Sequence, residues 1–224
     1  MKSILLFLSI SFTGILQAQN LNGTWVNTAE NSTILILIQD QYFIRTVYSP
    51  SEFIETLGGT YEIQNQLIRV QQEFDTAAKE LRILNFQFEL KKDVLELDYL
   101  EFTRLDEGNA PLAGVWQISG RVQNGKMQEI HQTGTRKTLK LLTGTYFQWF
   151  AIDPGENKFS GTGGGTYTFE NGKYIENIEF FSRDNSRVGA SLSFDDRIEN
   201  ENWIHTGLSS KGEPIHEVWK KIKK

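Results

Sequence analysis

The chain contains 224 residues, and its 28 acidic and 23 basic side chains give a formal charge of −5 at pH 7. This acidic balance disfavours binding to nucleic acids, which depends on basic side chains, and the absence of cysteine excludes disulfide scaffolds, thiolate nucleophiles and cysteine-ligated zinc. With 39% hydrophobic residues, the chain has enough apolar material for one or two buried cores, as in a globular protein.

The first segment, residues 1–18, has the pattern of a secretory signal peptide. Lys2 precedes an apolar run over residues 4–12, and the small residue Ala18 marks a cleavage point before Gln19. The run is shorter than the roughly 20 apolar residues that a transmembrane helix needs. We therefore expect a secreted or periplasmic protein without a membrane span.

The remaining sequence contains an internal repeat. Residues 21–25 return at 112–116, and residues 58–61 return at 164–167. Between 58–75 and 164–181, seven of 18 positions are identical, where unrelated sequences would share about one. Such repetition indicates a duplicated structural unit. It predicts two domains, 19–109 and 110–224, which meet at a polar segment containing glycine and proline.

Strand patterns dominate both domains, and no helical pattern follows residue 20. Segments 33–38, 84–90 and 174–181 are short and rich in β-branched or aromatic residues. The dipeptides Asn124-Gly125 and Asn171-Gly172 predict tight hairpin turns. Each repeat has room for seven to nine consecutive antiparallel strands, and closure of such a sheet removes its edges. We therefore expect an all-β protein with two tandem antiparallel up-and-down β-barrels.

The barrel prediction is strengthened by a family resemblance. Gly23-Thr24-Trp25 and Gly114-Val115-Trp116 resemble the opening motif of lipocalin-like (calycin) barrels. Residues 162–169 and 176–181 are similar to an uncharacterised lipocalin-like family of secreted bacterial proteins. The resemblance covers the second domain nearly throughout and the first less well. It implies a barrel that can enclose a small ligand, but it transfers no catalytic residue and no cofactor.

Each repeat serves as a control for the other. Glu176 stands where the first copy has Val70, and His205 stands where it has Leu97. An offset of 106 residues also places Phe88 opposite Phe194. Because a buried unpaired charge costs several kcal/mol, an interior Glu and His should face water, each other or a ligand. A ligand cavity would meet this requirement, and two alternatives stay open. Glu176 and His205 could be structural groups with satisfied hydrogen bonds, or the strand register could be slipped by one residue so that both side chains face solvent.

Other residues around this predicted cavity have weaker signals. Arg183 and Arg187 flank a turn, where they would form either a solvated rim or an anion-binding mouth. The glycine-rich segment 161–165 precedes a strand rather than a helix, which favours a strand bulge over a phosphate site. The histidines lack the spacing of a ligand set, so no metal or cofactor is expected; they are His131, His205 and His216.

The sequence thus predicts a secreted or periplasmic lipocalin-like protein that binds a small, partly apolar ligand in its second barrel. The expected ligand-binding residues are Glu176, His205, Tyr167, Trp203 and Trp149. No nucleophile elbow or close carboxylate pair indicates an enzyme. Two alternatives remain, an isomerase or hydrolase with His205 or Glu176 as general base, and a filled-barrel interaction module that acts through its surface. No oligomeric state is predicted.

Overall fold

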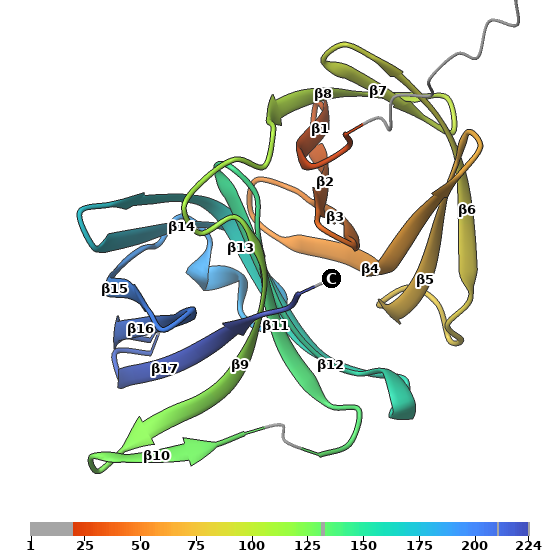
Figure 1. Ribbon diagram of the computed structural model, residues 1–224. Coiled ribbons are helices and arrows are strands. Elements are labelled where there is room, and N and C mark those ends of the chain that lie inside the picture. The colour runs from red at the N-terminus through yellow and green to blue at the C-terminus, as the bar shows by residue number, and fades with distance from the viewer. Residues whose placement is uncertain (1–19, 131–132, 210, 224) are drawn as a thin grey trace, which may run out of the picture.

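The computed structural model describes residues 20–130, 133–209 and 211–223, so the expected signal peptide over 1–18 lies outside the described residues. The described chain folds into two antiparallel β-barrels that lie side by side (Figure 1). Apart from strands, it contains two single-turn 3-10 helices, η1 (Pro154–Glu156) and η2 (Asn185–Arg187). Within the described residues, no helix has the length and apolar character needed to cross a membrane.

The first barrel closes with eight strands in sequential order, each paired with its neighbours in the chain and the last paired with the first. Its strands are β1 (Gly23–Ala29), β2 (Ser32–Gln39), β3 (Tyr42–Tyr48), β4 (Phe53–Gln64), β5 (Leu67–Asp75), β6 (Ile83–Lys91), β7 (Val94–Leu97) and β8 (Leu100–Asp106).

The second barrel repeats this plan with one addition. Its strands are β9 (Gly114–Gln123), β10 (Lys126–Glu129), β11 (Lys137–Leu142), β12 (Tyr146–Asp153), β13 (Lys158–Glu170), β14 (Lys173–Phe181), β15 (Ser191–Glu199), β16 (Asn202–Leu208) and β17 (Pro214–Lys221). Pairing of β17 with β9 closes an eight-stranded barrel, while β10 pairs only with β9 as an extra hairpin. The predicted fold class, all-β with two tandem antiparallel barrels, is confirmed.

The predicted turns and the glycine bulge are also present. Both residues of Asn124-Gly125 and of Asn171-Gly172 have positive φ, as a two-residue hairpin of this kind requires. The register of β13 against β14 shifts at Gly165, where a Cβ atom would lie 2.0 Å from the carbonyl oxygen of Asn177. An equivalent shift occurs at Gly59 in the first barrel. The glycines therefore permit a close backbone approach at the same place in both repeats.

Each barrel has its own apolar core. In each core, a tryptophan near the start of the first strand donates its indole N–H to a backbone carbonyl four residues earlier, at 2.9 Å. These are Trp25, bound to Leu21, and Trp116, bound to Leu112. The interior of the first barrel is packed with apolar side chains contributed by most of its strands. The Gly-x-Trp motif thus anchors the segment that leads into each barrel.

A third apolar cluster fills the space between the barrels. It combines outward-facing residues of β2, β3 and β5 with those of β9, β11, β12 and β14. Phe74 and Phe180 belong to this cluster, although alternation along their strands predicts that they point into the barrels. The prediction is wrong for these two residues, because the register shifts at the glycine bulges lie next to them.

Asp106, the last residue of β8, connects the two barrels. Its carboxylate accepts hydrogen bonds from the backbone N–H groups of Gly108 and Gly144, at 2.8 and 2.7 Å, and from the hydroxyl of Thr145, at 2.8 Å. Burial alone raises the pKa of Asp106, but hydrogen bonds, including one from Thr24, outweigh it and lower this pKa below its ordinary value. The ionised carboxylate therefore holds the turn between β11 and β12 against the end of the first barrel.

We expect Asp106→Asn to lower the free energy of unfolding by about 2 kcal/mol at pH 7, because hydrogen bonds to a charged acceptor are lost. A depressed folded-state pKa gives stability that is present above the unfolded pKa and is lost as the pH falls. The difference between variant and wild type should therefore shrink below about pH 4. Urea unfolding at pH 7 and pH 3 measures both values, and an equal difference at the two pH values would contradict this role.

Candidate functional site

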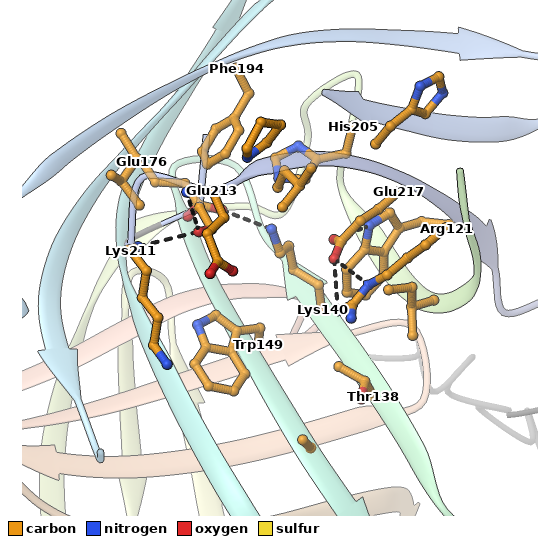
Figure 2. A pocket seen from close by; sticks show the side chains of 18 of the residues that line it. Arg121, Thr138, Lys140, Trp149, Glu176, Phe194, His205, Lys211, Glu213 and Glu217 are labelled. Atoms are coloured by element: carbon orange, nitrogen blue, oxygen red, sulfur yellow. Dashed lines mark hydrogen bonds and ion pairs between the residues drawn. The ribbon is translucent and has the colours of Figure 1, made fainter. Parts of the chain in front are cut away.

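The second barrel contains a cavity of about 1110 Å³ that is open to solvent, and Figure 2 shows side chains that line it. Every second residue from 136 to 142 faces the barrel interior, and together these residues run from the rim of the cavity to the core. Arg136 is exposed at the rim, Thr138 and Lys140 line the cavity, and Leu142 lies in the buried core. The wall is largely apolar, and its apolar members are Ile118, Val122, Ile130, Trp149, Ala151, Ile178, Phe181, Leu192, Phe194, Pro214, Ile215 and Trp219.

A buried ion pair crosses the floor of this cavity. Lys140 on β11 places its Nζ 2.8 Å from Oε1 of Glu176 on β14, and both residues are only 4% exposed. The two strands are not neighbours in the sheet, so the lysine side chain extends across the barrel interior. Since each charge would be costly alone in this environment, the pair must be kept intact for either group to remain buried.

Aromatic rings surround the Lys140 ammonium group. Its Nζ lies 5.1 to 5.7 Å from the centroids of four rings, those of Phe147, Tyr174, Trp203 and Trp219. Cation–π attraction at these distances partly replaces the hydration that burial removes. Burial and then the charge of Glu176 raise the pKa of Tyr174 well above its ordinary value, so its hydroxyl stays protonated.

A second buried pair lies beside the first. Nδ1 of His205 on β16 is 3.0 Å from each carboxylate oxygen of Asp196 on β15. Asp196 also accepts a hydrogen bond from the indole N–H of Trp203 at 2.8 Å. His205 lines the cavity, and its Nε2 has no hydrogen-bond partner within the described residues. Asp196 thus fixes the ring orientation and leaves Nε2 available to a molecule in the cavity.

A third acidic group stands at the edge of the floor. Glu217 on β17 is 8% exposed and accepts hydrogen bonds from Nε of Arg121, at 3.1 Å, and from the indole N–H of Trp219, at 3.2 Å. The half-exposed Arg121 side chain reaches this carboxylate from β9, and its Nη2 also lies 2.9 Å from Oε1 of Glu217. Figure 2 shows these groups converging on the same space as Lys140 and Glu176. The floor is therefore polar, whereas the wall above it is largely apolar.

The first barrel holds hydrocarbon at all four positions of the two buried pairs. Strand pairing makes Ile36 equivalent to Lys140 and Val70 equivalent to Glu176. It also makes the cross-strand pair Phe88 and Leu97 equivalent to Asp196 and His205. The four apolar residues are all buried. A barrel of this design can therefore be packed without ionisable groups.

The structure corrects the alignment of Phe88 with Phe194. Val70 pairs with Leu84, whereas Glu176 pairs with Leu192, so β15 follows β6 by 108 residues rather than 106. The two additional residues lie in the connection that contains η2. An offset of 106 sets Asp196 against Leu90, whereas strand pairing makes it equivalent to Phe88.

The structure brings most of the predicted site residues together. Glu176, His205 and Trp149 line the cavity, as do Arg183 and Arg187 near its rim. Tyr167 and Trp203 instead belong to the apolar core beneath the floor, where the Tyr167 hydroxyl donates to the carbonyl oxygen of Thr143 at 2.7 Å. Their rings do not line the cavity, although Trp203 supports the site through its hydrogen bond to Asp196.

Sequence reasoning missed three participants, Lys140, Asp196 and Glu217. A signal for Lys140 existed, because the offset of 104 residues that relates Tyr42-Phe43 to Tyr146-Phe147 also sets it against Ile36. Of the three histidines, His131 lies outside the described residues. Within the described ranges, no group of three or more acidic or histidine side chains is arranged to hold a metal ion.

Comparison with known families places the cavity within a recognised sequence unit. A family model described as a domain of unknown function, DUF4488, matches residues 111–224. The chain belongs to this family. The DUF4488 segment contains every strand of the second barrel, from β9 to β17, and with them the whole cavity and both buried pairs. No curated protein matches the sequence.

The Lys140–Glu176 pair can be tested through the equivalent residues of the first barrel. We expect Lys140→Ile alone to lower the free energy of unfolding by about 3–5 kcal/mol, because it leaves Glu176 charged and buried without a partner. Adding Glu176→Val should restore stability to within about 1 kcal/mol of wild type, since the pair then matches Ile36 and Val70. Urea unfolding of the single and double variants measures this. A double variant less stable than the single one would show that the pair is required for folding.

Proposed function

We propose that the protein binds a small, partly apolar molecule in the cavity of the second barrel and releases it unchanged. The observation that carries this proposal is a cavity of about 1110 Å³ whose floor has buried polar groups where the first barrel has hydrocarbon. Its volume lies just above the range of about 300–1,000 Å³ that is typical of small-molecule sites, which combine an apolar wall with a few fixed polar groups. The pattern of residues 1–18 supports action outside the cytoplasm, in the periplasm or after secretion.

The polar floor supplies the specificity in this proposal. Nε2 of His205 is available as a hydrogen-bond acceptor when Nδ1 carries the proton that faces Asp196. Glu176 lines the cavity with its Oε1 engaged by Lys140, and in this proposal its Oε2 accepts a hydrogen bond from the ligand. A ligand with a hydroxyl or amide group at its buried end would satisfy both acceptors, whereas a purely apolar ligand would leave them unpaired.

The filled-barrel module does not fit the second barrel, because this barrel contains an open cavity. The first barrel, with its apolar interior, is better suited to a structural role. We assign it the task of covering the apolar outer face of β11 and β12, which forms part of the cluster between the barrels. In this arrangement the first barrel supports the wall of the binding cavity from outside.

A neutral probe, N-phenyl-1-naphthylamine, tests whether the cavity admits an apolar molecule. We expect its fluorescence to rise on binding to the wild type, and Ala151→Phe to weaken binding at least about tenfold because the added ring occupies the cavity. Val47→Phe is the matched control, since Val47 occupies the equivalent position in the first barrel. Equal binding by all three proteins would show that the probe sits elsewhere, and would count against the proposed site.

One observation favours a second candidate function, acid–base catalysis in the same cavity. A histidine oriented by a buried carboxylate, with Nε2 facing a cavity, has the arrangement of a general base. In this candidate, Nε2 of His205 takes a proton from the bound molecule, and Asp196 stabilises the imidazolium that forms.

Incubation with a small-molecule extract of the producing cells distinguishes the two functions by mass spectrometry. A catalyst should convert a component when wild type is added, and His205→Gln should abolish the conversion because amide nitrogen cannot accept the proton. His216→Gln is the control, because this histidine also lines the cavity but is only half-buried. An extract whose composition is unchanged by the wild type supports binding without turnover.

A further inference from the structure

The open end of the cavity carries an excess of positive charge, although the chain as a whole has a formal charge of −5. Six basic and four acidic side chains line the cavity. Three of the acidic groups are each paired with a basic one, in the pairs Lys140–Glu176, Arg187–Asp184 and Arg121–Glu217. The remaining charges near the rim are those of three basic residues and one acidic residue.

These basic residues are Arg136, Arg183 and Lys211, and none of them forms an ion pair within the described residues. Arg183 is nevertheless held in place. Its Nε donates to the carbonyl oxygen of Ser160 at 2.8 Å, and its guanidinium group lies 5.5 Å from the centroid of the Trp149 ring. The terminal nitrogens of Arg183 form no hydrogen bond or ion pair within the described residues, so they are available to an anion.

The charge at the rim is separated from the polar floor by an apolar wall. Ile178 follows Glu176 by two residues on β14, and Phe194 precedes Asp196 by two residues on β15. Leu192 and Ile215 continue the wall toward the opening. A molecule that spans the cavity therefore meets polar groups at its inner end, hydrocarbon along its length and positive charge at its outer end. This order of surfaces selects for charge at one end of the ligand.

We infer that the ligand is an amphiphilic anion, with a carboxylate, sulfonate or similar group bound at the rim by Arg183 and Arg136, and an apolar body that enters the barrel first. This inference rests on the proposed function, since it names the chemical class of the molecule that the cavity binds. Arg183 supplies a planar, preoriented donor pair, and Arg136 and Lys211 add positive charge to the cavity lining.

A pair of probes with the same ring system isolates the anionic group. 1-Anilinonaphthalene-8-sulfonate carries a sulfonate that the neutral N-phenyl-1-naphthylamine lacks. We expect the sulfonate probe to bind the wild type more tightly, and Arg183→Gln and Arg136→Gln each to weaken its binding about fivefold. Both variants should bind the neutral probe as the wild type does. Raising the salt concentration should weaken only the sulfonate probe.

Arg197→Gln is the matched control, because Arg197 is an exposed arginine of the same barrel that does not line the cavity. Thermal unfolding of every variant verifies that Arg183→Gln retains the fold. If both probes bind equally and the rim variants bind the sulfonate probe like the wild type, the inference is overturned while the proposed function stands. If Ala151→Phe also leaves the binding of both probes unchanged, the proposed function fails as well.

Discussion

The cavity depends on the requirement that buried charges be paired. The ion pair of Lys140 and Glu176 joins strands on different sides of the second barrel, at a level where the first barrel packs Ile36 and Val70. Apolar side chains can pack at this level in many combinations, whereas a buried ammonium group must keep its carboxylate within about 3 Å. The pair and its four aromatic neighbours therefore fix a floor at a defined depth. The space above the floor remains open because smaller side chains, Thr138 and Ala151, replace Ile34 and Val47 in the wall.

The contact between the barrels reflects the duplication. Glu73 accepts a hydrogen bond from Tyr42 of its own repeat and from Lys137 of the other. Its equivalent, Glu179, accepts one from Tyr48 of the first repeat at 2.6 Å. Burial raises the pKa of Glu179 above its ordinary value, although the tyrosine hydroxyls act in the opposite direction. Each repeat thus presents the same carboxylate to the other, and these directional bonds orient the apolar surfaces that meet between the barrels.

The overall architecture could be predicted from the sequence because it depends on local and periodic signals. The duplicated motif around Trp25 and Trp116 indicated two units, and the positive-φ turn at Asn171-Gly172 indicated a hairpin. The comparison of repeats also placed Glu176 and His205 on the interior. Their partners were harder to predict, because an ion pair between distant strands has no fixed sequence spacing and because two additional residues before β15 displaced Asp196 from its equivalent. Phe180 points outward because a bulge changes the direction of the side chains that follow it. The alternation of residues along the sequence does not show such a bulge.

The two barrels show what the ionisable groups contribute. In a packed interior, hydrophobic residues of similar volume are usually as stable as a buried ion pair or more stable. The first barrel shows that this fold can be packed in that way, since Phe88 and Leu97 are buried together where the second barrel has Asp196 and His205. Stability alone therefore does not account for four ionisable side chains in one interior. Their common feature is their position at one cavity. Lys140, Glu176 and His205 line it, and Asp196 orients the His205 ring. A role in recognising a molecule in that cavity accounts for both their chemistry and their placement.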